Sequence, residues 1–66
     1  MQRRQADRWL TTAEAAVVMG ITTRALERLR GAGRGPVFTR VGRYPKYRLS
    51  HVLAYLEARS VVGRDE

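Results

Sequence analysis

The chain has 66 residues, which is room for one small domain. It contains no cysteine, so neither disulfides nor thiolate metal sites can stabilise it. No apolar run is long enough to span a bilayer, and residues 1–8 are too polar for a signal peptide. We therefore expect a soluble, cytoplasmic protein with no membrane partner.

The formal net charge of +7 lies entirely in residues 22–48. That stretch holds eight Lys and Arg residues against one acid, Glu27, while the cations and acids of the remaining residues cancel. A basic stretch, here called the basic block, within an otherwise neutral chain is typical of a surface that binds a polyanion. Nucleic acid is the leading candidate.

Residues 1–8 show no apolar period, so we predict a flexible N-terminal arm. The next residues predict a helix over Thr12–Met19. Thr11 and Glu14 have the spacing of a capping box, in which each side chain accepts a hydrogen bond from the other residue's backbone. Gly20 suits the left-handed conformation that ends many helices.

A second helix is predicted over Thr23–Arg30, capped by Thr22 and ended by Gly31. At helical spacing, Ala25, Leu26 and Leu29 share one face. Two short helices joined by Gly20-Ile21 match the helix-turn-helix plan. The small side chain of Ala16 lets the two helices approach closely, and Leu26 and Leu29 pack the second helix against the first. The alternative is a helical corner of an ordinary small domain, with its arginines merely solvated.

Glycine and proline punctuate residues 31–36 and mark a loop. Short strands are predicted over Val37–Val41 and Lys46–Leu49, joined by residues 42–45 in a hairpin. Ser50 is the expected cap of a last helix over His51–Arg59, followed by a flexible tail at residues 60–66. The inward residues of this helix are expected to be Val52, Leu53 and Leu56. The predicted class is mainly α with a small β-hairpin, a winged helix-turn-helix domain over residues 9–59.

A helix of this diameter fits the major groove of B-form DNA, where arginine pairs with guanine and glutamate with cytosine. The outward face of the second helix carries the candidate major-groove residues Thr23, Arg24, Glu27 and Arg28.

The hairpin tip, Gly42 and Arg43, is the candidate for the minor groove. Two alternatives stay open for the hairpin. It contacts only phosphates, or its charges protect an exposed strand edge from aggregation. The candidate phosphate contacts are Thr22, Arg30, Arg34, Arg40, Lys46 and Arg48. If about five phosphates are neutralised, log affinity falls against log salt with a slope of about −4.5.

Four segments carry a resemblance to a known family: Trp9–Ala16, the Met19–Thr22 turn, Gly35–Phe38, and Val41–Arg43 followed by Tyr47–Ser50. Together they resemble the excisionase-type, MerR-like winged helix-turn-helix proteins of phages and integrative elements, which include AlpA-like regulators. The resemblance implies that Thr22–Arg30 is the major-groove helix and Phe38–Arg48 the minor-groove wing. It also implies, for an excisionase, several copies on adjacent sites, bent DNA and assistance to a site-specific integrase in a prokaryotic or phage-infected cell. Fold similarity leaves a transcriptional regulator open.

Nothing in the sequence predicts an enzyme, a metal site or a cofactor. His51 is the only histidine, and the six acids are dispersed. Trp9 and Tyr47 are expected in the core, with Tyr44 near the hairpin tip. A rival of another class is an adaptor whose basic face binds an acidic protein.

Overall fold

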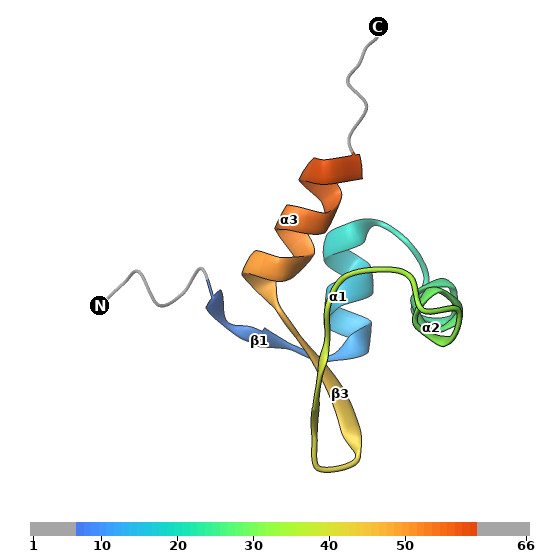
Figure 1. Cartoon of the computed structure of the whole chain (residues 1–66), viewed down its shortest axis with the longest axis vertical. Helices are drawn as coiled ribbons and strands as arrows, with labels where there is room; N and C mark the ends of the chain where they lie inside the picture. The colour runs from blue at the N-terminus through green and yellow to red at the C-terminus, as the bar shows by residue number, and fades with distance from the viewer. Residues whose placement is uncertain (1–6, 60–66) are drawn as a thin grey trace, which may run out of the picture.

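The computed structural model describes residues 7–59 as three helices and three short strands. In chain order these are β1 (Trp9–Leu10), α1 (Thr12–Met19), α2 (Thr23–Gly31), β2 (Thr39–Val41), β3 (Tyr44–Arg48) and α3 (Leu49–Arg59). Helix α1 lies at the centre with α2 and α3 on either side, and the β2–β3 hairpin projects away from the helices (Figure 1). The predicted winged helix-turn-helix fold is confirmed. The predicted tail and the first six residues of the predicted arm lie outside the described residues.

Helix α1 begins and ends as its sequence predicts. The Glu14 amide donates to Thr11 Oγ1 at 3.1 Å, and the Thr11 amide donates to Glu14 Oε1 at 2.9 Å, which completes the capping box. The Thr11 backbone hydrogen bond is the main cause that lowers the pKa of Glu14 from its usual 4.5. Gly20 follows with a φ of 75°, in the left-handed region, and its amide donates to the carbonyls of Ala16 and Val17.

Helix α2 starts at the predicted residue and ends one residue later than predicted. The Ala25 amide donates to the N-cap hydroxyl Thr22 Oγ1 at 3.0 Å. Gly31 is the last helical residue, and Ala32, not Gly31, occupies the C-cap. The short turn Gly20–Thr22 between α1 and α2 sets the angle at which α2 crosses α1.

The strands differ from the predicted ones in number and position. Strand β3 is central in an antiparallel sheet of order β1-β3-β2. Its first part pairs with β2, Val41 opposite Tyr44, and its last part pairs with β1, Leu10 opposite Tyr47. The hairpin turn is therefore Gly42-Arg43 alone, shorter than predicted. Pro45 lies where β3 has only β2 beside it, and an edge of this kind tolerates the missing amide of proline.

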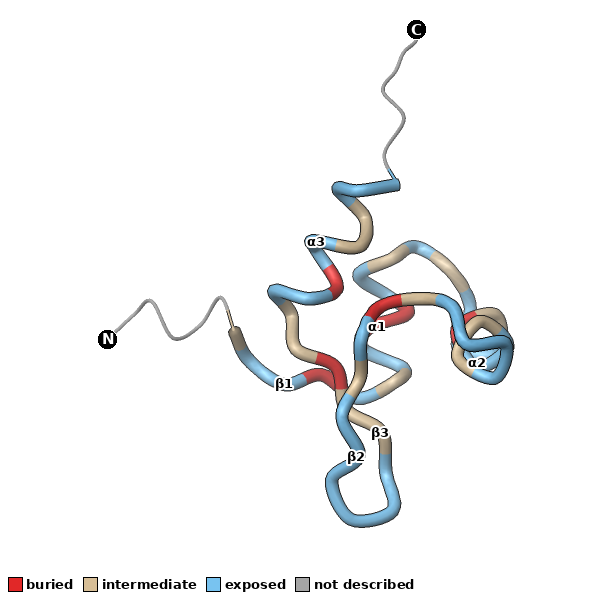
Figure 2. The backbone as a smooth tube through the Cα atoms, in the orientation of Figure 1, coloured by how far each residue is buried: buried red, intermediate tan, exposed pale blue. Residues whose placement is uncertain are grey.

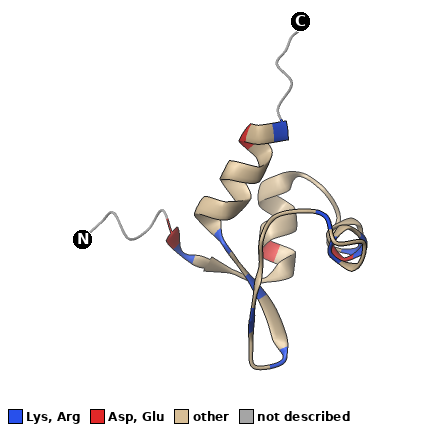
Figure 3. Cartoon of the chain, in the orientation of Figure 1, with Lys and Arg blue, Asp and Glu red and all other residues tan. Residues whose placement is uncertain are grey.

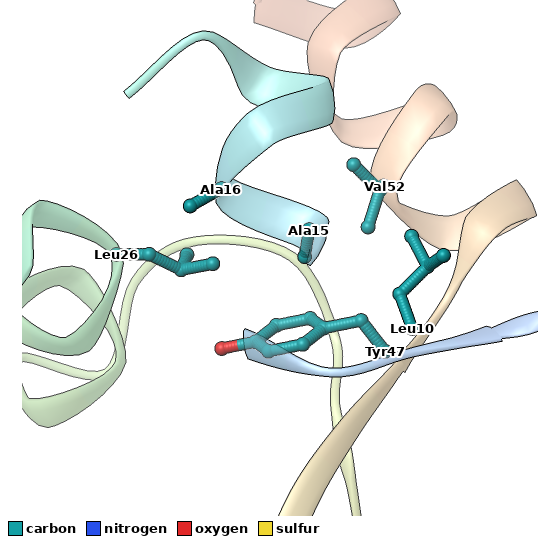
Figure 4. Packing of buried hydrophobic residues seen from close by; sticks show 6 residues of the cluster. All are labelled: Leu10, Ala15, Ala16, Leu26, Tyr47 and Val52. Carbon is teal, nitrogen blue, oxygen red and sulfur yellow. The ribbon is translucent and has the colours of Figure 1, made fainter. Parts of the chain in front are cut away.

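The core forms where α1, α2, α3 and the sheet meet (Figure 2). Its buried side chains are Leu10, Ala15, Ala16, Leu26, Tyr47 and Val52. The Tyr47 ring reaches from β3 across the underside of α1, with its hydroxyl oxygen toward α2 (Figure 4). The alanines on α1 leave room for this ring. Burying one large apolar side chain contributes roughly 1.5–3 kcal/mol, so a few residues hold this small domain together.

Two residues expected in the core are exposed. Trp9 is 44% exposed because successive strand residues face opposite sides, and Leu10 takes the core side. The Arg48 guanidinium lies over the Trp9 ring, 4.4 Å from its centroid. Leu53 is 48% exposed because α3 packs through Val52 and Leu56 and leaves Leu53 beside that face.

Asp7 and Arg8 were predicted to belong to the flexible arm, but both form hydrogen bonds with residues where β3 meets α3. The Asp7 carboxylate pairs with Arg48 and accepts from Ser50 Oγ at 2.6 Å. The Leu49 amide donates to the Arg8 carbonyl at 2.9 Å. Helix α3 thus begins at Leu49, directly after β3, and Ser50 lies inside it rather than before it. None of the helices within residues 7–59 combines the length and the hydropathy needed to cross a membrane.

We predict that Asp7→Asn lowers the melting temperature at pH 7. The Ser50 hydrogen bond and the Arg48 charge lower the pKa of Asp7 from its usual 3.8. The stabilisation by a carboxylate of lowered pKa is complete above the unfolded value and is lost as the pH falls through the folded value. The difference between the wild type and Asp7→Asn should therefore persist from pH 7 to about 3.8 and vanish below the folded pKa. Thermal unfolding followed by circular dichroism measures this. Glu57→Gln, which removes an exposed carboxylate from α3, is the control and should melt like the wild type at pH 7; equal melting of all three proteins at pH 7 would contradict the prediction.

Candidate nucleic-acid interface

The outward face of α2 presents polar and charged side chains. Leu26 is fully buried against α1, and this anchors the opposite face toward solvent. All four residues predicted for the major groove are exposed: Thr23, Arg24, Glu27 and Arg28. No other part of residues 7–59 covers these four side chains, so within that range this face of α2 is accessible to a ligand as large as a duplex.

The β2–β3 hairpin is a narrow projection with a cation at its tip. Gly42 has a φ of 67° and is followed by Arg43, and both residues are exposed. Val41 and Tyr44, the last pair before the turn, are also exposed, Tyr44 by 63%. The tip therefore combines one guanidinium with two apolar side chains, a composition suited to the walls of a DNA groove.

Most cations of residues 7–59 lie in one part of the molecule, whereas Arg8 precedes β1 and Arg59 ends α3. Lys and Arg gather on α2, on the loop after it and on the hairpin, whereas the central helix α1 carries an acid and no cation (Figure 3). Arg34 and Arg40 are exposed, and Lys46 is half-buried. Arg28 and Arg34 border an open hollow whose other lining residues are Ile21, Ala25, Leu29 and Ala32.

Arg30, predicted to bind phosphate, is turned toward the interior. Its Nη1 donates to Thr12 Oγ1 at 3.2 Å and to Tyr47 Oη at 3.0 Å. Its guanidinium also lies 5.6 Å from the centroid of the Phe38 ring. The structure thus gives Arg30 an internal role that its sequence position did not indicate.

Arg48, also predicted to bind phosphate, has an acidic partner within the chain. Its guanidinium lies between the Asp7 carboxylate and the Trp9 ring. A carboxylate beside it offsets its positive charge, so Arg48 adds little to the basic surface. Thr22 uses its hydroxyl as acceptor for the cap of α2, and the hydroxyl proton stays available for a phosphate oxygen.

Residues 9–60 match the protein family described as a helix-turn-helix domain. The chain belongs to this family. It is accordingly a small helix-turn-helix DNA-binding protein, and its ligand is double-stranded DNA. A comparison with curated proteins gave no match.

Sequence reasoning missed several residues of this helix-turn-helix domain that act at a distance. Asp7 meets Arg48 and Ser50 across more than forty positions of the chain, a separation that no helix or hairpin period spans. Thr12 and Phe38, which contact Arg30, lie 18 and eight positions from it, which is beyond the reach of the helical i+3 and i+4 spacing. Among residues 7–59, no three His, Cys, Asp or Glu side chains come together as a metal site.

We predict that Gly42→Val weakens DNA binding while Gly42→Asn preserves most of it. Space is open around a side chain at this position, so the cost comes from the left-handed backbone alone. A β-branched residue is strongly disfavoured there, by roughly 1–2 kcal/mol, whereas asparagine tolerates it. Titration of a labelled duplex measures affinity. Equal affinities of the two variants would show that the conformation of this turn does not matter for binding.

Proposed function

We propose that this helix-turn-helix protein is a sequence-preferring, architectural DNA-binding protein of the excisionase kind. In this role it binds adjacent sites cooperatively, bends the DNA and assists a site-specific integrase in excision. The observation that carries the DNA-binding part is the exposed polar face of α2 together with an arginine-tipped wing, both on the basic part of the molecule (Figure 3). The architectural part rests on analogy with the excisionase-type family, which the segments Gly35–Phe38, Val41–Arg43 and Tyr47–Ser50 resemble.

Helix α2 enters the major groove and reads bases. Arg24 and Arg28 donate in bidentate fashion to guanine O6 and N7, and Glu27 accepts from cytosine N4. Thr23, at the start of the helix, contacts a base edge or a thymine methyl group. The full burial of Leu26 supports this assignment, because it fixes the rotation of α2 about its own axis.

The wing follows the neighbouring minor groove. Arg43 at its tip enters the groove, where the negative potential attracts arginine most strongly when the groove is narrow. Gly42 permits the tight turn, and the exposed pair Val41 and Tyr44 packs on deoxyribose. The wing thereby responds to groove shape and leaves most base reading to α2.

Phosphates are held by a smaller set of residues than the sequence alone predicted. Arg34 and Arg40 are exposed, Lys46 lies across the hairpin from Thr39, and Thr22 adds a hydroxyl at the start of α2. Arg30 and Arg48 are left out because internal partners hold their guanidinium groups. Arg40 is retained although it lies over Phe38, since it is exposed.

One recognition helix reads few base pairs, so useful specificity requires several copies on neighbouring sites. Footprinting on the DNA that flanks the native gene tests this. Tandem protected repeats beside a recombination site, with bent DNA, are expected for an excisionase. A single protected site at a promoter would instead identify a transcriptional regulator. Binding no tighter than to random competitor DNA at physiological salt would favour the adaptor for an acidic protein.

We predict that Arg28→Ala and Lys46→Ala weaken binding in different ways. Loss of a base-reading arginine should cost about 1–3 kcal/mol and relax specificity at one base pair. Loss of a phosphate-binding lysine should weaken all sequences alike. Competition titrations against a set of single-base variants of the preferred site measure both effects. If both variants lost the same affinity for every sequence in the set, the division into base-reading and phosphate-binding residues would be contradicted.

We predict a salt dependence set by three phosphate-binding cations. With Arg34, Arg40 and Lys46 as that set, log affinity should fall against log salt with a slope of about −2.7. A slope of about −4.5, the value for five neutralised phosphates, would return Arg30 and Arg48 to the phosphate-binding set. Fluorescence anisotropy of a labelled duplex over a series of salt concentrations gives the slope.

A further inference from the structure

Arg30 stands at a junction of four parts of the fold. It comes from the last turn of α2, and its Nη1 donates to Thr12 on α1 and to Tyr47 on β3. Its guanidinium faces the ring of Phe38, the residue just before β2. We call these four side chains, Arg30, Thr12, Tyr47 and Phe38, the Arg30 junction.

The aromatic rings of the Arg30 junction tie it to both strands of the wing. Phe38 and Tyr47 lie 6.0 Å apart, centroid to centroid, and their planes are tilted by 43°. Phe38 leads into β2, and Tyr47 belongs to β3, so both strands of the hairpin are fixed at their base. Tyr47 is buried and therefore cannot shift without disturbing the core.

Helix α2 itself packs chiefly on α1, and strand β3 of the hairpin also contacts α1. The Arg30 junction is a side-chain connection between the C-terminal end of α2 and the base of the wing. A guanidinium suits this position because one of its nitrogens donates two hydrogen bonds while the cation lies over an aromatic ring. A lysine ammonium keeps the charge and loses the planar geometry.

We propose that Arg30 is a positioning residue that fixes the offset between α2 and the wing, so that the protein selects duplexes by the spacing of two segments. One segment is the major-groove sequence met by α2, and the other is the minor-groove segment met by the wing. This inference rests on the proposed function. Inserting one base pair between the segments moves them apart by about 3.4 Å and rotates them by about one tenth of a turn. A rigid connection cannot follow that change, whereas a loosened one can.

The test uses the full chain and the preferred duplex obtained by selection from random sequences, with the two segments located by hydroxyl-radical footprinting. One base pair is then inserted or deleted between them. The wild type should lose about tenfold in affinity, as for a mismatched base pair. Arg30→Lys and Tyr47→Phe should bind the original duplex more weakly but lose less than about threefold on the respaced duplexes. Arg59→Lys, an exposed arginine at the end of α3 that belongs to none of the proposed DNA contacts, is the matched control and should keep the wild-type penalty.

Tyr47→Phe keeps the buried ring and removes only the hydroxyl acceptor, so it carries the test if Arg30→Lys fails to fold, which circular dichroism shows. A variant that is merely less stable would lose affinity for all duplexes and keep the tenfold penalty, and this outcome overturns the inference. A wild type that binds a preferred duplex without any spacing penalty overturns it as well. A wild type with no preferred duplex overturns the proposed function itself, and the inference with it.

Discussion

The burial of Tyr47 is the interaction on which the rest of this domain depends. A chain of this size has little apolar surface to bury, and one aromatic ring fills the space that the small side chains of α1 leave open. The same residue pairs with Leu10 of β1 and accepts a hydrogen bond from Arg30. This one residue therefore joins the sheet, α1 and α2, and the hydroxyl of its ring provides the acceptor for Arg30 that a purely apolar residue would lack.

Two cations of the basic block have partners within the domain. A partly buried arginine in such a domain needs partners, since a buried or half-buried polar group without hydrogen bonds costs free energy. Arg30 and Arg48 meet that requirement with a tyrosine and an aspartate. The other cations of the basic block lie on α2, the following loop and the hairpin. Net charge alone does not show which cations already have partners within the chain.

Local chemistry predicted much of the fold. The capping box at Thr11 and Glu14, the N-cap Thr22 and the left-handed Gly20 act within a few residues, so the helices α1 and α2 were placed within one residue of their ends. Strand β1 was missed because two residues are too few to show an alternating pattern. The partners of Arg30 and Arg48 were missed because they depend on how distant segments pack. The exposure of the candidate base-reading face was predictable, since helical spacing alone sets it opposite Leu26.

Strand β3 continues into α3 without an intervening residue, and the Asp7 carboxylate clasps the joint at Arg48 and Ser50. The wing and the last helix therefore have no loop between them that could absorb a change of angle, and one carboxylate from the other end of the described chain holds that joint.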